Sequence, residues 1–175
     1  MKKIITLTIV ALLAGGTAFA QHGNCGNCPH HQQHAGMHQQ ACTAGDNFQQ
    51  AVAKAFPAVR SMKKDGNWTA IYDANGKLLG YAVNSKPASD GIKGYAGETP
   101  VMIAFNAKKK ITGVYLLANQ ETPRFTQHVQ KAGFYDQWNG LSVKKALKKK
   151  VDTVSGATFT SAAVVKSVQA VLETL

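Results

Sequence analysis

Residues 68–83 read WTAIYDANGKLLGYAV, and this stretch decides the fold class. Trp68 to Tyr72 is short and rich in aromatic and β-branched side chains, which favours a strand. Asp73 to Gly76 supplies the Asp, Asn and Gly typical of a turn, and Leu78 to Val83 returns as an apolar segment. The stretch therefore predicts a β-hairpin.

A second hairpin is expected farther along the chain. Val101 to Phe105 and Ile111 to Leu117 are strand-like, and Lys108 to Lys110 lies between them as a solvated turn. A loop rich in Pro, Ser, Asp and Gly, ending at Gly97, separates the two hairpins.

Helices are expected at both ends of this region. Apolar residues from Phe48 to Phe56 fall at helical spacing behind Asp46, and Pro57 ends that helix. A last helix begins at Thr160 or Ser161 and carries an apolar stripe, while residues 134–138 form a short helix or turn. The predicted fold is α+β: a small antiparallel sheet built from hairpins, with flanking helices and a C-terminal helix.

The first 20 residues have the pattern of a signal peptide. Lys2 and Lys3 are followed by the apolar stretch Ile4 to Ala14, and Ala18 to Ala20 has the small-residue pattern of a cleavage site. We expect cleavage after Ala20 and export to the periplasm or the extracellular space. The apolar stretch is shorter than the roughly 20 residues that span a bilayer.

The chain is strongly basic, with 20 Lys and Arg against nine Asp and Glu among 175 residues. Such a charge usually indicates an acidic partner. Export argues against nucleic acid, and no basic run is interleaved with base-stacking aromatic residues. The lysines of residues 144–150 form a basic helix surface, which either solubilises the protein or docks an acidic partner.

Residues 21–45 are expected to be a separate flexible tail rich in His, Cys and Gln. Cys25 and Cys28 have the spacing at which two thiolates reach one ion, and His30 and His31 could complete a Zn or Cu site. Two other interpretations stay open: an inert tether, and a redox or disulfide role.

The chemistry of the remaining chain concentrates in residues 152–158, which read DTVSGAT. This small-residue loop runs directly into the predicted C-terminal helix, whose free N–H groups suit a phosphate. The hydroxyl of Thr158 could bear such a phosphate. A helix capped by an ordinary hydroxyl after a turn would give the same pattern.

The DTVSGAT segment resembles the flavinylation motif of the exported FMN-binding domain family. That family includes the FMN-carrying subunits of Rnf-type and sodium-pumping NADH:quinone reductase complexes. The GYAG of residues 94–97 and the Glu-Thr-Pro of residues 121–123 are similar to family features and come in the same order. Family members often continue with Gly, where this chain has Arg124. The resemblance runs from about Phe56 to the C-terminus, and we expect the FMN-binding domain to comprise residues 46–175.

The resemblance implies covalent FMN, joined through a phosphoester to Thr158 by a separate flavin transferase that takes the FMN from FAD. It further implies a role for six more residues: a recognition loop of Ser155, Gly156 and Ala157, an acidic anchor at Asp152, and a flavin pocket near Glu121 and Thr122.

The expected function is that of an exported electron-transfer flavoprotein, a carrier or redox subunit more than a stand-alone catalyst. Its partners would be membrane or extracytoplasmic redox proteins, and it would work at or near the membrane surface. A flavin ring needs an apolar or aromatic surface, for which the candidates, each more often a core residue, are Tyr95, Phe125, Phe134, Tyr135 and Trp138. The alternative function is an exported Zn- or Cu-binding protein that uses its tail.

Overall fold

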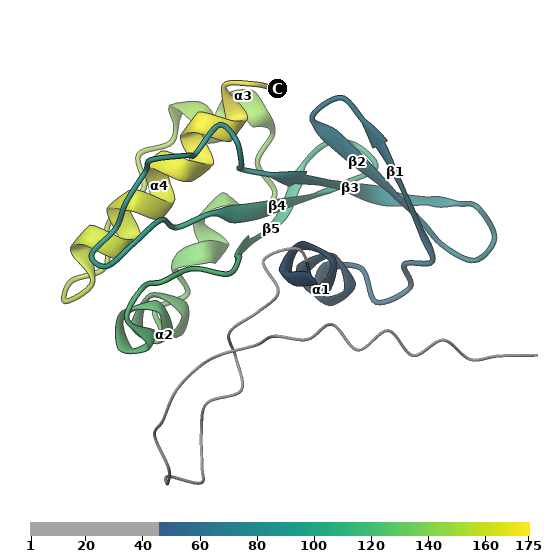
Figure 1. Ribbon diagram of the computed structural model, residues 1–175. Coiled ribbons are helices and arrows are strands. Elements are labelled where there is room, and N and C mark those ends of the chain that lie inside the picture. Colours follow the sequence, from purple (N-terminus) through teal and green to yellow (C-terminus); the bar gives the residue numbers. More distant parts are fainter. Residues whose placement is uncertain (1–45) are drawn as a thin grey trace, which may run out of the picture. The chain divides into compact units, whose positions relative to one another are not determined.

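The computed structural model describes residues 46–175 (Figure 1). The expected signal peptide and the tail with Cys25, Cys28, His30 and His31 lie outside the described residues. Within residues 46–175, no helix is both long enough and apolar enough to cross a membrane.

In the described part of the chain, five strands form one antiparallel sheet in the order β1-β2-β3-β4-β5. Both predicted hairpins are confirmed: β2 pairs with β3, and β4 pairs with β5. The strand β1 was not predicted, because all five of its side chains are exposed and the sequence shows no apolar alternation there. The strands are β1 (Ser61–Asp65), β2 (Trp68–Tyr72), β3 (Leu78–Asn84), β4 (Val101–Asn106) and β5 (Ile111–Leu116).

Within residues 46–175, four α-helices and one 3₁₀ helix accompany the sheet. They are α1 (Asp46–Ala55), α2 (Pro123–Lys131), η1 (Phe134–Trp138), α3 (Val143–Lys148) and α4 (Thr158–Leu172). The α+β class is thus confirmed, with the C-terminal helix in place. That helix begins at Thr158, two or three residues before the predicted start at Thr160 or Ser161. The helix α2 was not predicted.

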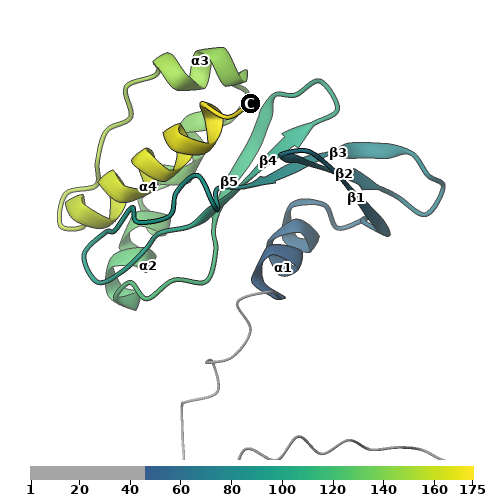
Figure 2. The ribbon, with the colours of Figure 1, turned by 45° about the horizontal axis from the view of Figure 1, so that its top comes forward.

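The sheet is covered on both faces, which is why β4 is buried along nearly its whole length. Because side chains alternate along a strand, Ile103 and Phe105 face one apolar cluster, and Met102 and Ala104 face another. The first cluster includes α4 and η1, and the second includes Val52 of α1. Figure 2 shows α1 and α4 on opposite sides of β4. This packing fixes the start of α4 relative to the sheet.

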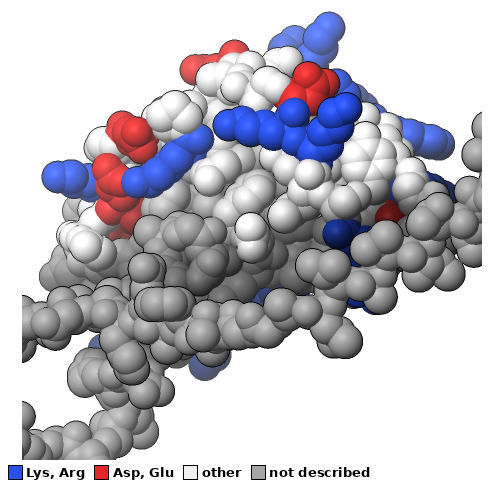
Figure 3. All heavy atoms as spheres, turned by 45° about the vertical axis from the view of Figure 1, so that its right-hand side comes forward, with Lys and Arg blue, Asp and Glu red and all other residues white. Residues whose placement is uncertain are grey.

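Most of the positively charged residues of the chain lie within residues 46–175. This range holds 18 of the 20 Lys and Arg, since Lys2 and Lys3 precede it, and all nine acidic residues. On the face shown in Figure 3, basic side chains stand out from the surface with acidic ones between them. The ion pairs in this part of the chain both belong to Lys86, which contacts Asp90 at 3.7 Å and Glu98 at 2.7 Å.

Candidate functional site

The loop before α4 is held against the first turn of the helix by a buried serine. The hydroxyl of Ser161 accepts a hydrogen bond from the Val154 N–H at 3.0 Å and donates to the Ala157 carbonyl at 2.9 Å. Gly156 adopts a left-handed backbone with φ of +81°, which a side chain disfavours. The position of Thr158 is therefore set by the backbone on both sides of it.

Thr158 is exposed and is the first residue of α4. Ala157 is the N-cap, and its side chain has no polar atom to cap the helix. No described residue accepts a hydrogen bond from the N–H groups of Thr158, Phe159 and Thr160. Free amides at a helix start carry partial positive charge and favour an anion. The exposed hydroxyl thus stands where a phosphate would be stabilised.

A cavity of about 290 Å³ lies between α2 and this loop. Arg124, His128 and Lys131 line it at helical spacing, so one side of α2 presents a basic row toward Gly156. The Nε2 atom of His128 lies 2.9 Å from the Ser155 carbonyl oxygen, a contact across 27 residues that ties α2 to the loop. Since Arg and Lys are positively charged at neutral pH, this cavity also favours an anion.

Glu121 is a buried carboxylate at the base of the site, with 5% of its surface exposed. It accepts hydrogen bonds from the Ala96 N–H at 2.8 Å, the Gly97 N–H at 3.0 Å and the Thr160 hydroxyl at 2.5 Å. Burial opposes its ionisation, but these hydrogen bonds outweigh that effect and hold the pKa of Glu121 below its usual value. Because its oxygens accept hydrogen bonds from protein donors, Glu121 holds residues 96–97 and the first turn of α4 together.

The glycine-rich segment 94–97 packs closely on Glu121. A Cβ atom on Gly94 would come within 2.7 Å of Glu121 Oε1, so only glycine fits there without a shift. Thr122 is half-buried and is the N-cap of α2, with its carbonyl accepting the Phe125 N–H at 2.9 Å. Both residues thus shape the backbone around the site.

The five aromatic residues that were candidates to contact the flavin ring differ in their exposure. Phe134 and Trp138 are fully buried in the first apolar cluster, and Tyr135 packs against it. Tyr95, 65% exposed, pairs edge to face with Phe125 at 5.2 Å between ring centroids. This pair lies at the basic cavity, because Phe125 lines it.

Phe159 is a further candidate site residue, which the sequence motifs did not indicate. It follows Thr158 directly and is 73% exposed, the most exposed of the large apolar side chains in the described part of the chain. The available signal was its place outside the apolar stripe of α4, because an apolar side chain off that stripe is expected to be exposed. An exposed aromatic side chain thus follows Thr158 in the first turn of α4.

The remaining predicted residues lie around the same loop. Ser155 and Gly156 are exposed, and Ala157 is buried under the loop. Asp152 is exposed, and its carbonyl oxygen accepts a long hydrogen bond of 3.4 Å from the Gln137 side chain. The Asp152 carboxylate makes no ion pair within residues 46–175.

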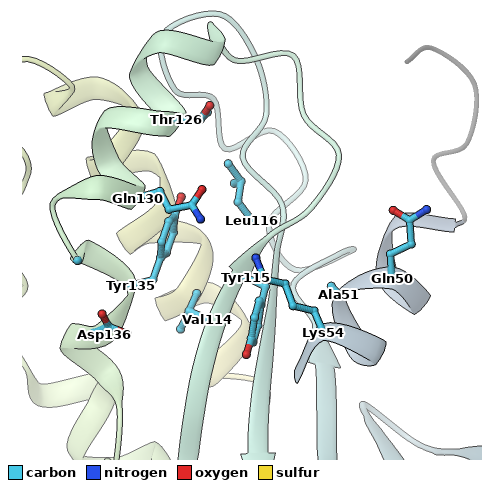
Figure 4. Close-up of a pocket in the computed structure, with 11 residues that line it drawn as sticks. Gln50, Ala51, Lys54, Val114, Tyr115, Leu116, Thr126, Gln130, Tyr135 and Asp136 are labelled. Carbon is cyan, nitrogen blue, oxygen red and sulfur yellow. The ribbon is translucent and has the colours of Figure 1, made fainter. Parts of the chain in front are cut away.

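A larger cavity, of about 570 Å³, lies on the other side of α2, between α1, β5 and η1 (Figure 4). Thr126 and Gln130 of α2 face it, together with Tyr115 and Tyr135. Burial raises the pKa of Tyr135 to about 12, so its hydroxyl stays protonated at neutral pH. This cavity contains neither Thr158 nor the basic row.

No group of three or more His, Cys, Asp and Glu side chains within residues 46–175 is arranged to hold a metal ion. The expected Zn or Cu ligands are in the tail, outside this range.

Comparison with known proteins finds a family model that is similar to the part of the chain containing the site. A family model described as an FMN-binding domain matches residues 94–173, which include the Gly94–Gly97 segment, Glu121 and the whole 152–158 loop.

Two curated relatives are subunits of ferredoxin:NAD(+) oxidoreductase complexes. The chain is 29% identical over 146 residues to a subunit of the Na(+)-translocating complex of Acetobacterium woodii, covering 74% of this chain and 68% of the relative. It is 31% identical over 118 residues to the corresponding subunit of the proton-translocating complex of Clostridium ljungdahlii, covering 63% and 60%. The chain thus spans less than two thirds of the second relative.

A solved structure, that of NqrC from Shewanella oneidensis, is 19% identical and covers 65% of each chain with a TM-score of 0.42. Together, the family match and the two relatives show that residues 94–173 of this chain are similar to the FMN-binding domain family.

Proposed function

We propose that this protein is an exported electron-transfer flavoprotein that carries FMN in a phosphoester bond to Thr158. One observation carries the proposal: an exposed threonine hydroxyl begins α4, beside free helix amides, within the segment that matches the FMN-binding domain. FMN, once bound, supplies transfer of one or two electrons.

The chain's own residues would act on the phosphate. Forming the bond joins Thr158 Oγ1 to the flavin-bearing phosphorus of FAD, breaks the bond between the two phosphates, and releases AMP, with the hydroxyl proton lost to solvent. The product is a phosphodiester with one negative charge. The amides of Phe159 and Thr160 and the cations of Arg124 and Lys131 would stabilise that charge.

The flavin ring would need a surface that excludes water from one of its faces. Phe159, which follows Thr158, and Tyr95, which pairs with Phe125 at the cavity beside Gly156, provide exposed aromatic area. Glu121 would position these parts, because it binds the segment before Gly97 and the first turn of α4 at the same time.

The partners proposed are a flavin transferase for maturation and redox proteins of a membrane complex. Support comes from the relatives, both of which are named as subunits of ferredoxin:NAD(+) oxidoreductase complexes. Export is proposed from residues 1–20, and a covalent bond would keep the cofactor from being lost outside the cell.

Co-expression with a flavin transferase tests this function. The protein should show flavin fluorescence in a denaturing gel, and the flavin absorbance should remain with the protein after acid precipitation. Protein made without the transferase should show neither signal. Flavin that is released by acid, or that binds equally without the transferase, would contradict a covalent carrier.

A further inference from the structure

Two lysine-rich segments far apart in the sequence lie side by side. An antiparallel bridge joins Lys110 to Ser142, and the Ile111 N–H donates to the Leu141 carbonyl at 2.8 Å. The turn between β4 and β5 therefore adjoins α3. We call the eight lysines that these segments carry the lysine surface: Lys108, Lys109, Lys110, Lys144, Lys145, Lys148, Lys149 and Lys150.

The two segments of the lysine surface, residues 107–112 and 139–151, contain no acidic residue, and the nearest one in the sequence is Asp152, two residues after Lys150. None of the eight lysines forms an ion pair with a described residue. Seven of them are exposed, while Lys149 is half-buried and donates to the Gln137 carbonyl. Like charges this dense repel one another, so an anionic partner would relieve a cost that the isolated protein bears.

The composition of the surface distinguishes between two kinds of anionic partner. Protein interfaces are enriched in Arg and aromatic residues and depleted in Lys. The lysine surface has no Arg, and the exposed large apolar side chains of residues 46–175 are Met62, Tyr95 and Phe159, all outside it. Clusters of lysine bind anionic headgroups through additive, non-directional attraction. We propose that the lysine surface binds an anionic phospholipid membrane.

The fold places this surface at the end of α4 away from Thr158. The Nζ atom of Lys109 lies 4.5 Å from the Trp68 ring centroid, and the neighbouring Asn67 side chain donates to the Thr174 carbonyl at 3.1 Å, just beyond α4. Figure 2 shows α3 beside the C-terminal end and away from the start of α4. Fifteen helical residues span about 22 Å, so lipid contact would leave Thr158 accessible to a partner.

Vesicle co-sedimentation of the full chain tests the proposal. Vesicles of equimolar phosphatidylglycerol and phosphatidylcholine should bind it at low salt, phosphatidylcholine alone should bind far less, and high salt should release it. The triple variant Lys144→Gln, Lys145→Gln, Lys148→Gln should bind the anionic vesicles roughly 100-fold more weakly. It keeps Lys149 and its hydrogen bond.

The matched control removes the same charge elsewhere. Lys54→Gln, Lys77→Gln, Lys93→Gln replaces three exposed lysines outside the lysine surface and should change binding by only a few-fold. Equal losses in the two triple variants would show dependence on net charge alone and would overturn the proposal. Failure of the unaltered chain to prefer anionic vesicles would overturn it too and would favour an acidic protein partner. Because no flavin signal is used, the result is independent of the proposed function.

Discussion

The hydroxyl of Thr160 donates a buried hydrogen bond of 2.5 Å to the carboxylate of Glu121. Thr160 follows the exposed Thr158 by two residues in α4. The same carboxylate binds the amides of Ala96 and Gly97. Three segments that are distant in the sequence are thereby joined beneath the candidate flavin site: residues 94–97, the start of α2, and the first turn of α4.

Glu121→Gln should lower the free energy of unfolding by about 2 kcal/mol, because the neutral amide weakens charge-assisted hydrogen bonds and turns an N–H group toward other donors. Urea unfolding measures the loss. Glu98→Gln is the control, since Glu98 accepts from Lys86 and Gly91 at a more exposed position and should lose less. Equal losses of unfolding free energy in the two variants would mean that burial of the Glu121 hydrogen bonds adds nothing to stability.

The contribution of Glu121 should also depend on pH. Its pKa is lower in the folded state than the ordinary value of 4.5, so the folded protein favours the ionised form. That stabilisation is fully present above 4.5 and is lost as pH falls through the folded pKa. The difference in unfolding free energy between the unaltered protein and Glu121→Gln should therefore shrink between pH 5 and pH 3. A difference that stays constant over this range would contradict an ionised Glu121.

Gly156→Ala should reduce both stability and flavin attachment. Gly156 has a φ of +81°, where a Cβ atom costs about 1 kcal/mol, and relaxing that strain would move Thr158. Gly140→Ala is the control, with a φ of +77° and open space around the added Cβ, so it should cost similar stability while leaving attachment unchanged. Thermal unfolding and gel fluorescence measure the two effects. If both variants take up flavin normally, the geometry at Gly156 is not needed for attachment.

Arg124→Gln combined with Lys131→Gln should slow flavin attachment roughly tenfold, because two cations no longer favour the phosphate at the start of α4. The rate is followed with purified transferase and FAD. Lys54→Gln combined with Lys77→Gln removes the same charge away from the cavity and should leave the rate nearly unchanged. If both double variants slowed flavin attachment equally, the slowing would come from the loss of net charge and not from the loss of cations at the cavity.

The sequence was enough to predict the parts of the fold that have a local signal. The two hairpins showed apolar segments around turn residues, and α4 showed an apolar stripe. In contrast, β1 exposes every side chain, and α2 buries little besides Val129, so neither element has a clear periodic pattern. Alternation also could not reveal that β4 is buried on both faces, since a continuous apolar run fits several structures.

The same distinction applies to the site. Residues 152–158 are contiguous, so their motif could be recognised directly. The contacts that support it, Glu121 with Thr160 and His128 with Ser155, join residues 39 and 27 apart. They depend on how α2 packs against α4, which no local pattern specifies. The resemblance implied a flavin pocket near Glu121, and this stays a prediction; the structure adds that the carboxylate accepts hydrogen bonds from Ala96, Gly97 and Thr160.

Attachment of FMN at Thr158 is tested most directly by the intact mass of three proteins, each co-expressed with a flavin transferase. The unaltered protein should gain the mass of one FMN less one water, and peptide fragmentation should place that mass on Thr158. Thr158→Ala should gain nothing. Thr153→Ala, which removes an exposed hydroxyl from the same loop, should gain the full mass. An undiminished FMN mass on Thr158→Ala would contradict attachment at this residue.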